Sequence, residues 1–220
     1  MHPVLRLYED VLSSAENVEF RLAPLPRFIF VTHGSATIDG KVINENEAWQ
    51  GDGAATVKPG AGGVTCWRWE LTRGDCGSTV ACAPGMITHE KLSAYLETAP
   101  KGDWLMRGDS VAFPPGGCAY LHSHQGPGIR CLVEGGIRVD THGRSTSYGP
   151  GGAWYESGPD QVFAQAAADR PTRFIRVMIL PRELLGKSSI QYLNEADKAK
   201  PKTQSYKIYA DAPVEFAGKK

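Results

Sequence analysis

Turn-forming residues interrupt this sequence at short intervals, and they constrain its fold more than any other feature. The chain contains 25 glycines and 15 prolines, which are spread along its length and not gathered in a linker. Between the turns lie short segments rich in β-branched and aromatic residues, several of which alternate with period two. The clearest of these segments are residues 28–31, 36–38, 65–71, 137–139 and 173–180. Glycine also occurs where hairpin turns demand positive backbone angles, as at Gly40 and Gly143. The pattern predicts an all-β protein.

One segment departs from this strand pattern. Within His89–Glu97, Leu92 and Leu96 share a face at helical spacing, and Pro100 lies just beyond the end. We therefore expect a short helix here, in a linker between two β units. Shorter helical turns are expected at Pro181–Leu185 and Glu195–Lys200, and the alternation in Ser205–Ala210 predicts an edge strand that adds to a neighbour.

An internal repeat sets the number of domains. Val31–Gly34 aligns with Leu132–Gly135, Trp49 aligns with Trp154, and Trp67–Leu71 aligns with Arg176–Leu180. The spacing drifts by a few residues, as expected when turns change length while strands are kept. We predict an N-terminal β unit at 1–88, a helical linker at 89–103, a second β unit at 104–182 and a C-terminal arm at 183–220.

The charge balance and the cysteines narrow the class of protein. Lys and Arg number 24, as do Asp and Glu, so no net positive field attracts nucleic acid or an anionic membrane surface. No apolar run reaches the roughly 18 residues of a membrane-spanning helix, and the first residues do not resemble a secretion signal. The five cysteines form no Cys-x-x-Cys pair, which favours a reducing compartment. We expect a cytoplasmic protein that binds neither nucleic acid nor membrane.

Two histidines, His122 and His124, stand two residues apart in a predicted strand. Side chains alternate along a strand, so both imidazoles point to the same side. Imidazole binds divalent transition metals well, which makes this pair half of a candidate metal site. The alternative is a polar cleft that holds the two histidines without a metal.

The sequence around this pair resembles the first signature of the cupin superfamily, Gly-x5-His-x-His-x3-4-Glu-x6-Gly. The match begins near Gly116 or Gly117 and ends at Gly135 or Gly136. Gly128 stands where cupins place their glutamate ligand. The resemblance implies a bicupin, in which two tandem jelly-roll barrels are joined by the linker with the short helix, and it implies a homodimer.

The second cupin signature, Gly-x5-Pro-x-Gly-x2-His-x3-Asn, is similar to residues 151–165. Its glycine matches Gly158, whereas Glu156, Gln161 and Gln165 occupy the proline, histidine and asparagine positions. Only two of the four usual ligands are therefore kept. The resemblance implies a divalent ion (Fe, Mn, Ni or Zn) on the two histidines, completed by Gln161, Gln125 or Glu156.

Arg130 lies on the same predicted strand face as Gly128, so its guanidinium points into the second barrel. A buried arginine needs an anion, which is either Glu156 in a structural ion pair or a substrate carboxylate. The other side chains predicted to contact the substrate are Tyr120, Trp154, Glu156 and Phe163, although aromatic residues in a small barrel also suit its core.

The first β unit has no histidine pair in the matching place. Counting back from Gly34 as from Gly135 reaches Arg21 and Ala23. His33 has no partner two residues away, which favours a surface or core role. We predict a first barrel that lacks metal ligands and serves packing, dimer formation or closure of the pocket.

The resemblance and the site residues together predict a metal-binding bicupin that acts on a small oxygenated or carboxylate-bearing molecule, as a dioxygenase, isomerase or lyase. No catalytic residue is assigned. One alternative is a non-catalytic cupin that binds a small ligand or has a structural role, which the missing ligands favour. Another is a metal-free lyase or isomerase with His122 or His124 as its base.

Overall fold

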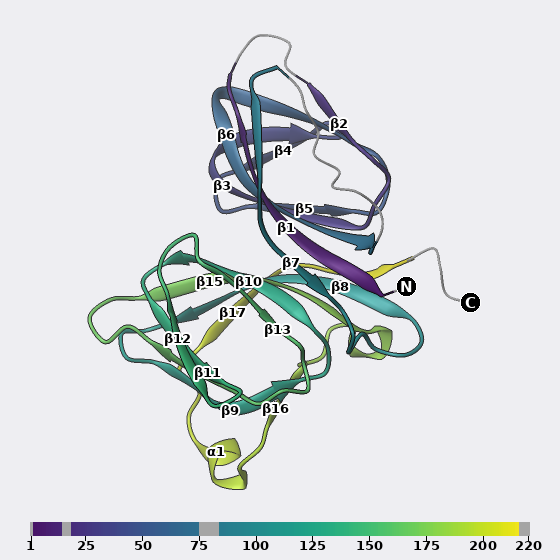
Figure 1. Cartoon of the computed structure of the whole chain (residues 1–220). Helices are drawn as coiled ribbons and strands as arrows, with labels where there is room; N and C mark the ends of the chain where they lie inside the picture. Colours follow the sequence, from purple (N-terminus) through teal and green to yellow (C-terminus); the bar gives the residue numbers. More distant parts are fainter. Residues whose placement is uncertain (1, 15–18, 75–83, 216–220) are drawn as a thin grey trace. The chain divides into compact units, whose positions relative to one another are not determined.

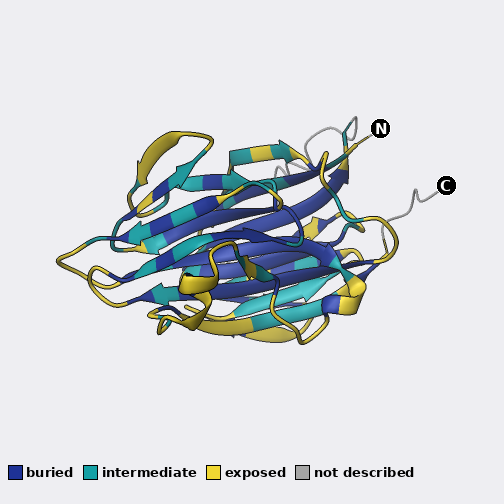
Figure 2. Cartoon of the chain, turned by 90° about the horizontal axis from the view of Figure 1, so that it is seen from below, coloured by how far each residue is buried: buried dark blue, intermediate teal, exposed yellow. Residues whose placement is uncertain are grey.

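The structure is a computed structural model that describes residues 2–14, 19–74 and 84–215. The chain divides into two compact units, residues 1–96 with 214–220 and residues 97–213. Nearly all regular elements in the described residues are strands (Figure 1), which confirms the predicted all-β fold. The long central strands are mostly buried, and exposed residues gather in the turns (Figure 2). Among the described residues, no helix is both long enough and apolar enough to cross a membrane.

The first unit contains one sheet in which β3, β6 and β1 are the long central strands. Its order is β4-β3-β6-β1-β7, while β2 pairs with β6 and β5 pairs with β3. Side chains from these strands enclose an apolar core that includes Leu12, Val31, Ile38 and Val57. The strands are β1 (Pro3–Leu12), β2 (Phe20–Leu22), β3 (Arg27–Ile38), β4 (Lys41–Asn44), β5 (Ala48–Gly51), β6 (Ala55–Arg73) and β7 (Met86–Tyr95).

The second unit contains two sheets of five strands each, in the orders β13-β10-β15-β8-β17 and β12-β11-β14-β9-β16. Inward-facing apolar residues of both sheets, among them Val111, Leu132 and Val162, form one core. Two short helical elements, η1 (Arg182–Leu184) and α1 (Glu195–Ala199), lie between the long strands β15 and β17. The strands are β8 (Trp104–Phe113), β9 (Cys118–His124), β10 (Gly128–Glu134), β11 (Ile137–Thr141), β12 (Arg144–Tyr148), β13 (Ala153–Glu156), β14 (Val162–Ala166), β15 (Thr172–Pro181), β16 (Ile190–Tyr192) and β17 (Ser205–Val214).

The helix predicted at His89–Glu97 is wrong, because these residues lie mostly in strand β7. Strand β7 pairs antiparallel with β1 from Met86 to Tyr95, with a register shift between Leu7 and Tyr8. Helix propensity is a weak preference, and here the hydrogen-bonding edge of β1 decides the conformation. The linker predicted at 89–103 therefore begins with a strand of the first unit.

The arm predicted at 183–220 also contains strands of the second unit. Strand β16 pairs with β9, and β17 lies beside β8 at the edge of its sheet. The predicted edge strand at Ser205–Ala210 thus forms, but it pairs within its own chain. The helical turns predicted near 181–185 and 195–200 are confirmed by η1 and α1.

The described cysteines Cys66, Cys118 and Cys131 are free thiols. Cys76 and Cys82 lie outside the described residues.

Candidate metal centre

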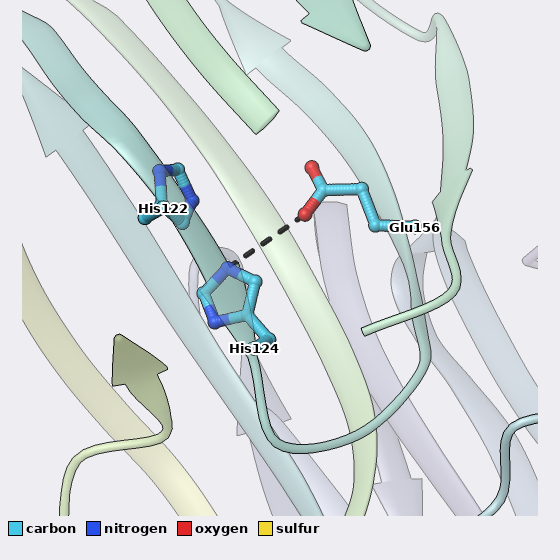
Figure 3. Close-up of side chains that lie close together, drawn as sticks. All are labelled: His122, His124 and Glu156. Carbon is cyan, nitrogen blue, oxygen red and sulfur yellow. Dashed lines mark ion pairs between the residues drawn. The ribbon is translucent and has the colours of Figure 1, made fainter. Parts of the chain in front are cut away.

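Strand β9 places His122 and His124 on one face, as the sequence predicted. Their rings lie 4.9 Å apart between centroids and meet at 79°. Both residues are buried, with exposed fractions of 4% and 5%. The strand periodicity therefore brings two imidazoles to one point inside the second unit (Figure 3).

The third member of the cluster is Glu156, at the end of strand β13. Glu156 pairs in register with Gly128 of β10. Gly128 stands where cupins carry their glutamate ligand, so the carboxylate here belongs to the residue directly opposite, on the neighbouring strand. Its Oε2 lies 3.7 Å from Nε2 of His124 (Figure 3). The ligand atoms of His122, His124 and Glu156 all lie within 4.8 Å of one another, and no other such cluster occurs in the part of the chain that the structure describes.

Hydrogen bonds fix the orientation of both imidazoles. Nδ1 of His122 lies 2.7 Å from the carbonyl oxygen of Tyr120, and because a carbonyl only accepts, this nitrogen carries the proton. Nδ1 of His124 lies 3.5 Å from the hydroxyl oxygen of Ser189. Such partners on Nδ1 leave Nε2 as the nitrogen for a metal ion.

Burial decides the charge of the two histidines. Desolvation lowers the pKa of His122, partly opposed by the charge of Glu156. Desolvation also holds the pKa of His124 well below its ordinary value, and the positive charges of Arg176 and Arg130 add to this effect. Both rings are therefore neutral at pH 7, which is the form that binds metals.

Arg130 lies beside the cluster, and its charge is balanced by Glu156. Its Nη2 lies 2.7 Å from Oε2 of Glu156, and the two side chains are 1% and 9% exposed. Its Nη1 donates to the carbonyl oxygen of Gly128 at 2.7 Å. Burial lowers the pKa of Arg130 to about 10, against the opposite effect of Glu156. Trp154 Nε1 donates to Oε1 of Glu156 at 2.9 Å, so the carboxylate is held from two sides.

A second buried ion pair, which the sequence analysis missed, lines the same site. Arg176 of β15 pairs in register with both Arg130 of β10 and Asp109 of β8. Its Nε and Nη2 donate to the two carboxylate oxygens of Asp109 at 3.0 and 2.7 Å. The available signal was the presence of charged residues, Asp109 and Arg176, in the middle of two strands with many apolar residues.

Four predicted residues are not among those that line the cavity around the cluster, and the first two are the glutamines. The side chain of Gln161 is exposed, and its backbone carbonyl accepts a hydrogen bond from Thr141. Gln125 is half-buried, and its backbone N–H donates to the carbonyl of Ser189. Neither lines the cavity around His122, His124 and Glu156.

Tyr120 and Phe163 are also displaced from the site. Strand β9 has two residues, 120 and 121, where β14 has only Phe163, so a β-bulge reverses the face of the strand. The ammonium groups of Lys200 and Lys202 lie 4.7 and 5.3 Å from the ring centre of Tyr120. Phe163 lines a separate hollow with Gln161. Trp154, in contrast, is buried beside the cluster.

The first unit has different residues at the equivalent positions. Trp49 pairs with Ile29 as Trp154 pairs with Arg130. Gly51 is opposite Arg27, in the place that Glu156 occupies opposite Gly128. The strand register also makes Arg68 the equivalent of Arg176. The sequence alignment of the repeat had matched Arg176 with the preceding residue, Trp67.

Buried ion pairs fill the interior of the first unit near these positions. Arg68 Nε lies 2.6 Å from Oδ2 of Asp10, and its Nη1 lies 2.9 Å from Oε1 of Glu70. Arg27 Nε donates to the same oxygen of Glu70 at 3.0 Å. All four side chains are fully buried. The carboxylates are therefore engaged by arginines.

Comparisons with known proteins show similarity in structure only. No protein-family model matches the chain, and no curated protein matches it by sequence. AerE from Microcystis aeruginosa superposes with a TM-score of 0.58 at 14% identity, over 82% of this chain and 89% of that protein. The formate complex of oxalate decarboxylase from Lactobacillus farciminis gives a TM-score of 0.61 at 12% identity, over 91% of this chain and 82% of that one. A point mutant of the oxalate decarboxylase OxdC from Bacillus subtilis gives 0.61 at 11% identity, over 91% of this chain and 73% of that one.

Proposed function

The chain has the bicupin fold, and from this premise we propose that its second barrel binds a divalent metal ion through His122, His124 and Glu156 and acts on a small carboxylate-bearing molecule. The observation that carries the proposal is the convergence of three buried ligand atoms, from two strands, within 4.8 Å. Buried polar groups without a use are costly, and perturbed histidines in a cavity are typical of functional sites.

The donor set suits a divalent transition metal. Two neutral imidazoles with one carboxylate are the ligands of many iron(II) sites, and the same groups bind manganese, nickel and zinc. Glu156 Oε2 is buried, forms the ion pair with Arg130 at 2.7 Å and has no further polar partner at hydrogen-bonding distance among the described residues. This oxygen therefore has a lone pair available for an ion.

The residues of the chain have distinct roles around such an ion. The ion, when bound, polarises an oxygen atom coordinated to it. The backbone carbonyl of Tyr120 and the hydroxyl of Ser189 orient the imidazoles. The indole N–H of Trp154 orients the carboxylate of Glu156, and Arg130 offsets the charge of that carboxylate. The cavity around the three ligands measures only about 20 Å³, which has room for roughly one water molecule. The side chains of the three ligands are also largely shielded from solvent.

The choice of substrate class rests on two observations. The structural neighbours include an oxalate decarboxylase and its complex with formate, and both named molecules are small carboxylates. The site also gathers two arginines, Arg130 and Arg176, each already paired with one carboxylate, so that a bound divalent ion would leave the site positive and favour an anion. The reaction type, dioxygenase, isomerase or lyase, stays a prediction.

A non-catalytic cupin that binds a small ligand is the second candidate. The ion pair between Arg130 and Glu156 favours it, because the carboxylate charge is already balanced without a metal. A homodimer and a cytoplasmic location also stay predictions, and light scattering and fractionation of cells would test them.

Metal analysis of the purified protein tests the proposal. We expect about one equivalent of ion per chain after incubation with Fe, Mn, Ni or Zn and desalting, and none in the His122→Ala/His124→Ala variant. The exposed histidines His33 and His142 provide the matched control, since their double alanine variant should keep the ion. Absence of metal from the wild type under all four conditions would overturn the metal proposal and leave the ligand-binding cupin.

A further inference from the structure

A second, larger cavity adjoins the metal centre within the same unit. Its volume is about 210 Å³, and strands β8, β15 and β17 and the segment 186–190 form its walls. It shares Arg176, Ile190 and Tyr206 with the cavity of about 20 Å³ around His122, His124 and Glu156. The inner cavity has room for roughly one water-sized particle. Of these two cavities, only the outer one therefore has room for an organic molecule.

The charged groups of the outer cavity leave a positive excess. Arg107 Nη2 lies 2.7 Å from Oδ2 of Asp211, and Arg176 is paired with Asp109. Lys187 lines the cavity and forms no ion pair with a described residue. Two arginines are thus matched by two aspartates, and one lysine is not. The excess charge favours an anionic occupant.

Arg176 is the cation best placed to meet this anion. Asp109 engages its Nε and Nη2, and Nη1 makes no hydrogen bond to the described residues. The pair with Asp109 fixes the guanidinium, so that Nη1 is preorganised for a carboxylate. Arg130, the candidate from the sequence, is less suitable because Glu156 and the carbonyl of Gly128 already occupy it.

The remaining wall is apolar and open. Tyr206 and Ile208 are two residues apart on β17 and both line the cavity, although they are 48% and 53% exposed. Ile190 of β16 belongs to the same wall. Large apolar side chains that line a cavity while remaining half exposed gain from covering an apolar ligand.

We propose that the outer cavity is a binding site for aromatic or branched carboxylic acids, with the acid group at Arg176 and the apolar group against Tyr206 and Ile208. A two-carbon acid would leave the apolar wall uncovered, so the site favours a larger acid than oxalate. The inference rests on the proposed function only in one respect, which is that a bound acid could react only if the metal ion is present. Binding itself needs no metal, because every residue used here belongs to the outer cavity or its shared wall.

Benzoate is a suitable probe, since it combines a carboxylate with one flat apolar ring. We expect calorimetry on chelator-treated protein to detect benzoate, and to show oxalate and the neutral analogue benzamide binding at least about tenfold more weakly. Equal binding of benzamide would overturn the anionic part of the proposal. Tighter binding of oxalate than of benzoate would overturn the apolar part.

Two variants place the probe in the cavity. Tyr206→Ala should weaken benzoate about tenfold through the lost ring contact, while Tyr209→Ala, at the opposite alternation of the same strand, should not. Lys187→Gln should weaken benzoate a few-fold, with Lys207→Gln as its control. Both lysines are exposed, so neither change is expected to unfold the chain.

The outcomes separate this inference from the proposed function. Absence of benzoate binding in metal-free and metal-loaded protein overturns the inference, even where the ion binds. Binding that Tyr206→Ala and Lys187→Gln leave unchanged places the probe elsewhere and also overturns it. Benzoate binding that both variants weaken, in a protein that binds no metal, supports the inference while the proposed function fails.

Discussion

Replacing Glu156 by glutamine removes the charge of the buried ion pair while it keeps the shape of the side chain. The new amide oxygen can still accept from Trp154 Nε1, which donates to Oε1 of Glu156 at 2.9 Å. Arg130, only 1% exposed, then has no counter-ion on Glu156. Removing one partner of a buried pair costs about 3 to 5 kcal/mol.

We expect a loss near the lower end, about 3 kcal/mol, because Arg130 keeps its bond to Gly128. For a chain of this size, such a loss lowers the melting temperature by about 6 to 12 °C. Urea unfolding of chelator-treated protein at pH 7 measures the change in free energy. Tryptophan fluorescence and circular dichroism should both be recorded, since a chain of two units need not unfold in a single step.

Two further variants make the result interpretable. Glu134→Gln removes a similar pair with Arg173 that lies at the surface, so it should change stability little. Arg130→Met in the Glu156→Gln background removes the uncompensated charge and should restore most of the loss. If Glu156→Gln costs no more than Glu134→Gln, or if Arg130→Met restores nothing, the reasoning from an uncompensated buried charge is refuted.

Protonation, crowding and thiol burial predict effects that can be measured separately. Burial lowers the pKa of His122 and His124 below the ordinary 6.5, so the unfolded chain binds protons that the folded chain does not. The urea midpoint of metal-free protein should therefore fall as the pH drops from about 7 to about 5, and it should fall less in a double glutamine variant, His122→Gln/His124→Gln. Gly158 has φ of 103°, and a Cβ there would lie only 2.7 Å from the carbonyl carbon of Gly126. Its carbonyl accepts from the N–H of His124 at 2.7 Å, so Gly158→Ala should lower stability by about 1 to 3 kcal/mol and weaken metal binding in a titration. Burial raises the pKa of the Cys66 thiol, so iodoacetamide should label the half-buried Cys118 before Cys66, as read by mass spectrometry of the native protein.

A different result would contradict each of these three predictions. A midpoint that falls equally in the wild type and in the double glutamine variant would assign the pH effect to other groups. Gly149 has open space around its Cα, and a loss in Gly149→Ala as large as in Gly158→Ala would contradict the crowding argument. Labelling of buried Cys66 before Cys118 would contradict the order expected from burial.

Local patterns were sufficient for the strands and for half of the metal centre. The alternation of side chains put His122 and His124 on one face without any knowledge of their neighbours. The same local reasoning failed at His89–Glu97, where helical spacing was real but β1 offered a strand partner. It also failed at Tyr120, because the bulge in β9 depends on how β14 pairs with it.

The sequence by itself determined two β units, an inward histidine pair and an inward arginine, since period-two alternation and an internal repeat are properties of neighbouring residues. Only the tertiary structure decided that Glu156 completes the cluster and that Arg176 joins Asp109 at its wall. Those contacts depend on the register of β13 against β10 and of β15 against β8. Register is set by the packing of whole strands and by the turns that join them, and a shift of one residue would move Glu156 to the other face.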